Sequence, residues 1–159
     1  MDTKGYAEVN EDVAAYKVFG HSHTVEMGKA IALLSGTKPA PPMTFLPYLA
    51  PMTRGILATC FVKGSATHEE CYAIAEKFYA NSPFVRVLSA SREKESVHTK
   101  WATGSNLVFV NYAKQGDTII AFAAIDNLEK GAAGQAVQNA NLMLELEATL
   151  GLMGAPVVP

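Results

Sequence analysis

The sequence lacks the features that mark membrane proteins and nucleic-acid-binding proteins. No apolar run approaches the roughly 20 residues that a membrane-spanning helix needs, and residues 1–5 lack the apolar core of a signal peptide. The 13 basic and 15 acidic residues give a net charge of -2. Because the basic residues are also scattered, they give no electrostatic footprint for nucleic acid. We therefore expect a cytoplasmic protein that binds neither membranes nor nucleic acid.

Cysteine is also scarce. The two cysteines, Cys60 and Cys71, are too few for a disulfide framework and lack the spacing of metal ligands. Cys60 lies inside an apolar run, which predicts a small buried side chain. Cys71 follows Glu69 and Glu70, whose negative charges would raise the pKa of its thiol. Neither cysteine is expected to act as a nucleophile.

Two nucleotide-binding fingerprints are missing as well. The chain has no Gly-x-Gly-x-x-Gly after an early strand and no Walker phosphate-binding loop. What is present is ordinary for a globular protein, with 49% hydrophobic and 18% charged residues. A length of 159 residues fits one domain over 1–159, large enough to bury a core.

The hydrophobic pattern predicts an α+β fold, with helices covering a mostly antiparallel sheet. The apolar run 54–63 is predicted to be a central strand, and a hairpin is expected with its turn at 116–117. Strands are expected at 16–19, 44–49, 54–63, 84–88, 106–112 and 118–125. Residues up to 15 and the charged stretch 91–100 are predicted to be irregular and exposed.

Three helices are expected. The first starts at 25 behind a Thr24 cap and ends at Gly36, and the second spans 67–81 behind a capping box formed by Thr67 and Glu70. The third runs from about 130 to 150 and has two apolar faces. We expect one of these faces to be exposed or covered by a second copy of the chain.

The start of the last helix, within the stretch 126–141, is rich in small residues. Gly131 and Gly134 would let a ligand or another part of the backbone approach the unpaired N–H groups and positive dipole of a helix start. Such a start suits an anion or a cofactor. Close packing against a neighbour explains the glycines equally simply, and the local pattern favours packing.

A cluster of polar residues precedes the first helix. If His21 and His23 are extended, they point to one side, and Glu26 can return to the same place. Three interpretations remain open. From spacing alone, helix capping without chemistry ranks first, acid/base chemistry second and a metal site third.

Two further residues have alternative roles. Arg54 opens the strongest strand and could hold a carboxylate or phosphate with two parallel hydrogen bonds, although pairing with a nearby acid is favoured locally. Ser105 precedes the hairpin and offers a hydroxyl, which turn chemistry explains equally well.

Taken together, these segments resemble the C-terminal part of the N-acetyl-gamma-glutamyl-phosphate reductases, which are related to aspartate-semialdehyde dehydrogenases. The matching segments run in the order of that family across nearly the whole chain. They are residues 20–24, 51–59, 78–80, 83–87, 104–106 and 126–141.

The resemblance implies a fold like the C-terminal domain of glyceraldehyde-3-phosphate dehydrogenases and a homo-oligomer. It implies that a cysteine attacks an acyl phosphate and that NADPH then delivers a hydride to the thioester, giving the semialdehyde. By the same resemblance His21 is the catalytic acid/base. Substrate-binding roles fall to His23, Glu26, Arg54 and Ser105, and cofactor-binding roles to Asn127, Lys130 and Gly131.

The chain departs from the family pattern at Ser22, Val25 and Tyr48. It also lacks the Pro-Gly-Cys-Tyr-Pro-Thr motif of the nucleophile and the nucleotide-binding domain, both of which lie upstream in such enzymes. We therefore expect the substrate-binding and dimerisation portion of an NADP-dependent reductase, inactive alone. It would be either a fragment of such an enzyme or one polypeptide of a split enzyme whose other, separate half binds the nucleotide. The alternatives are a non-catalytic oligomerisation or binding module that keeps the fold, and a metal-binding domain.

Overall fold

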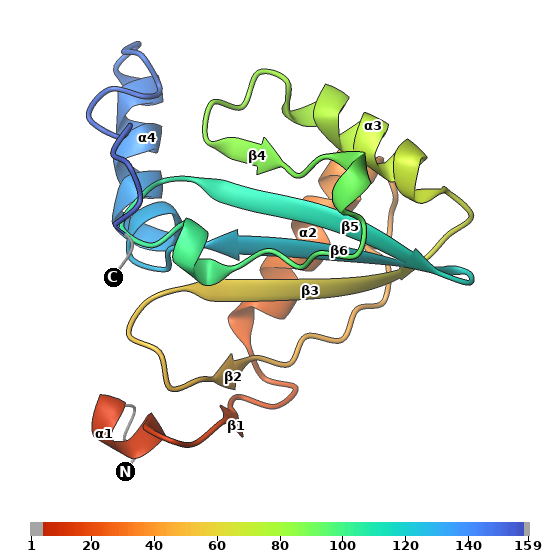
Figure 1. The fold of residues 1–159 in the computed structure, drawn as a ribbon, viewed down its shortest axis with the longest axis horizontal. Helices are drawn as coiled ribbons and strands as arrows, with labels where there is room; N and C mark the ends of the chain where they lie inside the picture. Colours follow the sequence, from red (N-terminus) through yellow and green to blue (C-terminus); the bar gives the residue numbers. More distant parts are fainter. Residues whose placement is uncertain (1–4, 158–159) are drawn as a thin grey trace. The chain divides into compact units, whose positions relative to one another are not determined.

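The computed structural model describes residues 5–157 and divides the chain into two compact units, residues 1–53 and residues 54–159. In the first unit, two helices accompany a two-stranded sheet (Figure 1). The strands pair antiparallel, with Ala14 opposite Leu49. These elements are α1 (Tyr6–Val9), β1 (Ala14–Ala15), α2 (Ser22–Ser35) and β2 (Tyr48–Leu49).

The start of the chain differs from its prediction. The stretch expected to be irregular contains α1 and β1, and the strand predicted at 16–19 is wrong. Lys17 and Phe19 have φ angles of 47° and 57°, in the left-handed region, so the chain turns at this point. The pattern of apolar residues in a segment this short does not distinguish a strand from a turn.

Helix α2 begins three residues earlier than predicted. Its N-cap is His21, whose ring nitrogen Nδ1 accepts a hydrogen bond of 3.2 Å from the backbone N–H of His23. Thr24 therefore lies inside the helix, and the prediction that it forms the cap is wrong. The predicted end is confirmed, because Gly36 follows the helix with a φ of 67°, a conformation that suits glycine.

The second unit contains a four-stranded sheet in the order β3-β6-β5-β4. β3 to β6 and β6 to β5 pair antiparallel, and only β4 and β5 pair parallel. The predicted α+β class with a mostly antiparallel sheet is thus confirmed, as is the hairpin with its turn at 116–117. The strands are β3 (Ile56–Lys63), β4 (Val85–Val87), β5 (Val108–Gln115) and β6 (Thr118–Ile125).

The position of β3 corrects one prediction. It is an edge strand, not a central one, and every residue from Ile56 to Lys63 is exposed. Cys60 shares this exposure, so its predicted burial is wrong. The composition of this segment correctly predicts a strand but not its position in the sheet. An apolar run indicates a surface that another element can cover, and it does not show which element does so.

One face of the sheet is covered by α3 (His68–Tyr79), which packs over β4 and β5 (Figure 1). Its predicted capping box is confirmed. The Thr67 hydroxyl accepts from the N–H of Glu70 at 3.2 Å, and the Glu70 carboxylate accepts from the N–H of Thr67 at 2.7 Å. The pKa of the Cys71 thiol is raised as predicted, with burial as the largest cause and Glu70 a lesser one.

The opposite face carries a core of buried residues, into which the segment after β4 folds. Val97 is 2% exposed and packs with Leu88 and Ala124. Two short 3-10 helices, η1 (Ala90–Arg92) and η2 (Thr99–Trp101), shape this segment. The prediction of an exposed loop over 91–100 is therefore wrong in part, since one apolar residue among many charged ones is enough to anchor it.

The last α-helix, α4 (Gly134–Met143), is shorter than predicted. Glu145 has a φ of 56°, which ends the helix, and the following residues form turns. The side-chain amide of Asn141 donates to the carbonyl of Leu150 at 3.0 Å and holds these turns back against the helix. A hydrophobic period alone cannot distinguish such turns from further helix.

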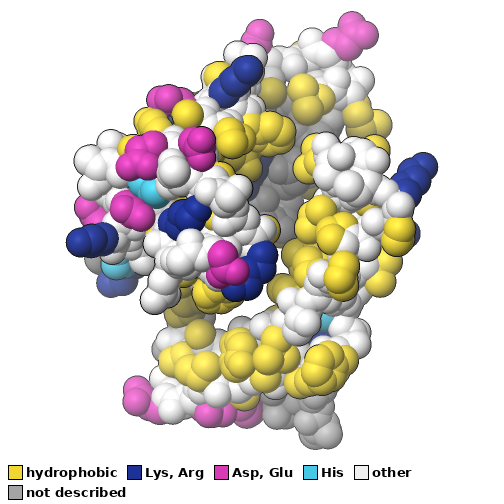
Figure 2. All heavy atoms as spheres, turned by 90° about the vertical axis from the view of Figure 1, so that its right-hand side faces the viewer, with side chains coloured by type: hydrophobic (Ala, Val, Ile, Leu, Met, Phe, Trp, Pro, Cys, Tyr) yellow, Lys and Arg dark blue, Asp and Glu magenta, His cyan; other side chains and the backbone are white. Residues whose placement is uncertain are grey.

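Much apolar surface is open, and Figure 2 shows exposed hydrophobic side chains in yellow gathered in patches that hold few charged groups. The exposed apolar face predicted for the end of the chain is present. Its exposed large side chains are Val137, Leu142, Met143, Leu144, Leu146 and Leu150. On the edge strand, Phe61 is 70% exposed. Contiguous apolar surface of this kind marks an interaction site. Among the described residues, no helix has the length and apolarity to cross a membrane.

Candidate functional site

The histidine cluster lies in the first unit, at the start of α2. The rings of His21 and His23 are 4.6 Å apart between centroids, and the ring of Phe45 lies 5.3 Å from that of His21. His23 Nε2 is 4.0 Å from the Glu26 carboxylate. The structure therefore brings together the three residues that the spacing grouped.

His21 is the N-cap of α2, so this residue does cap the helix. Whether the cluster also has a chemical role is a separate question that the cap does not decide. Within residues 5–157, no group of three or more histidine, cysteine or acidic side chains is arranged to hold a metal ion. The metal interpretation thus gains no support. Since Nδ1 of His21 accepts a hydrogen bond in the cap, the proton of the neutral ring is carried by Nε2.

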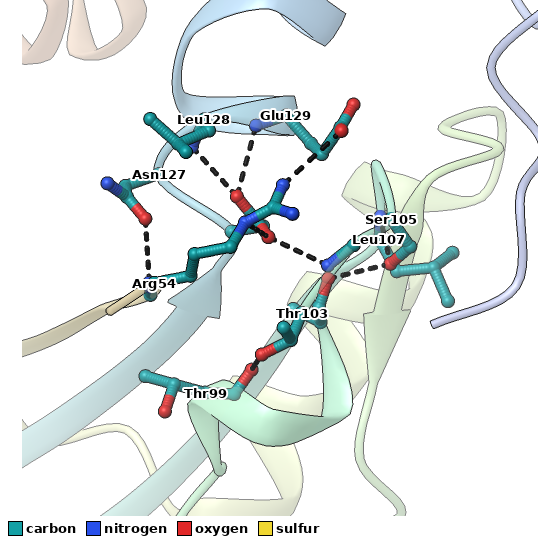
Figure 3. Close-up of polar contacts among 12 residues, drawn as sticks. Arg54, Thr99, Thr103, Ser105, Leu107, Asn127, Leu128 and Glu129 are labelled. Carbon is teal, nitrogen blue, oxygen red and sulfur yellow. Dashed lines mark hydrogen bonds and ion pairs between the residues drawn. The ribbon is translucent and has the colours of Figure 1, made fainter. Parts of the chain in front are cut away.

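The second unit has a polar centre at the buried carboxylate of Asp126, which is 0% exposed. Figure 3 labels three residues that contact this carboxylate, Arg54, Leu128 and Glu129. Oδ1 accepts from the backbone N–H groups of Leu128 and Glu129 at 2.8 and 3.1 Å. Oδ2 accepts from the N–H of Gly104 at 2.7 Å and lies 2.9 Å from Arg54 Nε. Oδ1 therefore accepts two hydrogen bonds, whereas Oδ2 accepts one and forms an ion pair with Arg54.

These donors set the charge state of Asp126. Burial alone would raise the pKa of its carboxyl, but the three backbone N–H groups and the Arg54 guanidinium outweigh burial, so the pKa is lowered from its ordinary value. The carboxylate is consequently ionised at neutral pH. It forms one fixed charge that joins the start of β3, the turn before β5 and the loop after β6.

Backbone N–H groups at the start of the last helix have partners inside the protein. The loop enters a π-helical turn, η3 (Glu129–Ala133), and the backbone N–H of Gly131 donates to the Asp126 carbonyl at 2.9 Å. The N–H groups that could have received an anion are therefore used internally. A Cβ on Gly134 would overlap the side chain of Asn106, so close packing explains this glycine.

Arg54 is paired with acids, as its local sequence context favoured. Besides the contact with Asp126, its Nη2 donates to Glu129 Oε1 at 3.3 Å. The Arg54 side chain is 30% exposed, and so part of the guanidinium faces solvent. A planar guanidinium fixed at one end and open at the other can still bind an anion.

Asn127 lies next to Arg54 in space. Its Oδ1 accepts from the backbone N–H of Gly55 at 2.7 Å (Figure 3). With the oxygen used in this way, the side-chain NH2 group is left as a donor for a ligand.

Lys130 and Ser105 have contacts inside the second unit. The Lys130 ammonium lies 4.8 Å from the centre of the Phe84 ring and donates to Gln138 Oε1, and burial lowers its pKa. Ser105 is 1% exposed, and its hydroxyl donates to the Ala102 carbonyl at 2.9 Å. These contacts are what turn and packing chemistry require, and ligand roles for both residues stay predictions.

A known protein family matches most of this chain. The family model described as the dimerisation domain of semialdehyde dehydrogenases matches residues 1–127, which include both the histidine cluster and the Arg54 region. The chain belongs to this family of semialdehyde dehydrogenase dimerisation domains. The predicted resemblance is thereby confirmed, and so is the presence of an oligomer-forming domain type.

Several relatives of the family member described here are named N-acetyl-gamma-glutamyl-phosphate reductase. The protein from Bradyrhizobium sp. (strain ORS 278) is 52% identical over 157 residues, which cover 98% of this chain and 47% of the relative. The one from Methylobacterium sp. (strain 4-46) is 50% identical, with coverage of 98% and 46%. The one from Pseudomonas entomophila (strain L48) is 38% identical, with coverage of 97% and 44%. The chain spans about half the length of the curated relatives it matches.

For this member of the dimerisation-domain family, sequence reasoning assigned no role to Asp126 or Glu129. The signal for both was present, because an aspartate followed three residues later by a glutamate, just before a helix, matches the capping pattern. The two backbone N–H groups that donate to the Asp126 carboxylate are those expected to donate to a capping residue. What the pattern could not show is that the same carboxylate reaches Arg54 and Gly104.

Proposed function

We propose that this chain forms the acid/base and substrate-binding part of an NADPH-dependent oxidoreductase that converts N-acetyl-gamma-glutamyl phosphate to N-acetylglutamate semialdehyde in arginine biosynthesis. The observation that carries the proposal is 52% identity over 98% of the chain to a protein with that reductase name. The half-buried His21, the exposed His23 and the partly exposed Arg54 are side chains of the kinds this chemistry needs.

In this proposal His21 exchanges a proton with the substrate at Nε2, since Nδ1 serves the helix cap. His23 and Glu26, on the following turn, bind the substrate beside it. Arg54 holds an anionic group of the acyl phosphate. NADPH would supply the hydride when bound, and Asn127, Lys130 and Gly131 would be the residues of this chain that hold it.

Reconstitution tests the proposal. The chain is mixed with a separately made nucleotide-binding half of the Bradyrhizobium relative, and NADPH oxidation is followed with N-acetyl-gamma-glutamyl phosphate. We expect activity in the mixture and none with either part alone. A well-folded mixture without activity contradicts a role as one half of a reductase.

A variant pair separates catalysis from a merely structural contribution. We expect His21→Ala to lower kcat by about 100-fold or more, the usual effect of losing a general acid/base. His98→Ala, which removes an exposed histidine of the second unit, serves as the matched control and should leave the rate unchanged. Equal rates for both variants would favour the alternative, a non-catalytic oligomerisation or binding module.

The proposal includes self-association and a cytoplasmic location. The exposed apolar side chains of β3 and of the C-terminal helix region, together with the dimerisation-domain family, support a homo-oligomer. Light scattering should therefore give at least twice the mass of one chain, and a monomer over the whole concentration range contradicts it. Fractionation of cells that produce the tagged chain tests the location.

A further inference from the structure

Arg54 is held by two carboxylates whose situations differ greatly. Asp126 is completely buried, and its carboxylate accepts three backbone hydrogen bonds and forms an ion pair with Arg54 Nε. Withdrawing the guanidinium would leave a buried charge short of a partner, which is strongly unfavourable. The Asp126 contact is therefore permanent. It fixes the Nε side of the guanidinium and determines which of its edges faces outward.

Glu129 holds the same guanidinium weakly. Its carboxylate makes one contact, from Arg54 Nη2 at 3.3 Å, and its side chain is 37% exposed. Pairs that are this accessible to water contribute little to stability and are readily broken. The remaining N–H groups of Arg54 have no protein acceptor among the residues that the structure describes.

The geometry points to Glu129 as a specificity-determining residue, because its carboxylate already holds Arg54 Nη2 and so competes with an anionic ligand for this guanidinium. This inference rests on the proposed function, in which Arg54 is the substrate anchor. A tethered carboxylate competes at high local concentration, so a ligand with one negative charge gains little by replacing it. A phosphoryl group has nearly two negative charges and more acceptor oxygens, so it gains binding free energy when it replaces Glu129 at Arg54.

The consequence is selection between two anionic groups. Glu129 should discriminate against simple carboxylates at Arg54 while still admitting phosphate. After phosphate leaves, the side chain can return to Nη2, which restores the pair seen in this structure.

Calorimetric titration of the purified 159-residue chain with inorganic phosphate, and separately with acetate, tests the inference. Glu129→Gln removes the competing charge at nearly constant size. We expect it to bind phosphate about two- to five-fold more tightly, the range that a partly exposed ion pair supports, and to gain at least as much for acetate. Glu147→Gln makes the same charge change at an exposed residue that forms no ion pair with any residue in 5–157, and it should leave both affinities unchanged.

Two further variants keep the test decisive. Glu129→Asp retains the charge but withdraws it from Nη2, so it should also strengthen phosphate binding and shows whether reach matters. Arg54→Lys, checked for folding by circular dichroism, should abolish the gain, because it removes the planar fork.

The inference is overturned if Glu129→Gln binds phosphate no more tightly than the unmodified chain, if no variant binds phosphate, or if Glu147→Gln gains as much. These results do not depend on reductase activity. A gain with Glu129→Gln alongside failed reconstitution would retain the competition at Arg54 and reject the proposed function. Reductase activity after reconstitution, without tighter phosphate binding by Glu129→Gln, would support the proposed function and reject the competition at Arg54.

Discussion

Replacement of Asp126 by asparagine is the perturbation with the largest expected effect on the second unit. The substitution keeps the shape of the side chain but turns one oxygen into an NH2 group, which cannot accept a hydrogen bond. Whichever oxygen is lost, two donors lose their acceptor. They are either the N–H groups of Leu128 and Glu129 or the Gly104 N–H and Arg54 Nε.

The magnitude follows from burial. Each unsatisfied buried donor costs about 1–3 kcal/mol, and removing one charge of a buried pair costs about 3–5 kcal/mol. We therefore expect Asp126→Asn to lower the free energy of unfolding by about 3–5 kcal/mol at pH 7. Urea denaturation measures the total, and amide hydrogen exchange at Gly104, Leu128 and Glu129 shows whether the loss begins at these donors.

The difference in the free energy of unfolding between the wild type and Asp126→Asn should also depend on pH. The folded-state pKa of Asp126 is lowered, so its contribution to stability is present above the unfolded pKa of about 3.9 and is lost as the pH falls through the folded pKa. The gap between wild type and Asp126→Asn should thus narrow as the pH falls below about 4. Asp117→Asn, at an exposed aspartate paired with Lys63, is the control and should change little. A gap below about 1 kcal/mol at pH 7 would refute the reasoning.

Three more predictions concern packing, capping and ionisation. Gly134→Ala would push a methyl group into the buried Asn106 side chain and should destabilise by about 1–3 kcal/mol in urea; Gly154→Ala, where a Cβ meets nothing, should be nearly neutral, and equal midpoints for the two would count against the packing argument. Thr67→Ala should cost about 1 kcal/mol by breaking the capping box, whereas Thr67→Ser should retain most of it in thermal unfolding; a serine variant as unstable as alanine would contradict this. Burial raises the pKa of Tyr112 to about 12, so Tyr112→Phe should remove the last phenol from the ultraviolet titration. The stability that this phenol contributes is present below pH about 10 and is lost as the pH rises toward 12. If the ultraviolet titration of Tyr112→Phe instead loses a phenol that ionises near pH 10 in the wild type, the assignment is wrong.

Local signals were enough to predict much of the second unit. The capping box at Thr67 and the hairpin at 116–117 depend on neighbours only a few residues apart, and both are confirmed. The edge position of β3 depends on pairing with β6, more than fifty residues later, which no local pattern encodes. Because β3 and β6 are so far apart in the sequence, the strong apolar pattern of residues 54–63 predicts a strand but not its place in the sheet.

The candidate site divides in the same way. The helix cap at His21 and the pairing of Arg54 with an acid were among the interpretations that the residues offered. That one buried carboxylate also accepts from Gly104 could not be foreseen, since this contact crosses 22 positions between a turn and a loop. The ligand roles carried over from the resemblance stay predictions.

The two edges of the sheet in the second unit are unequal. β4 offers three residues at one edge, whereas β3 offers eight at the other, and β3 has a hydrogen-bonded neighbour on one side only. An open row of N–H and C=O groups along a long apolar strand is a template that any other extended chain can join. Growth of this sheet, in a folded assembly or an aggregate, is therefore polar and proceeds from β3, so a charged residue placed midway along that strand should improve the solubility of the chain.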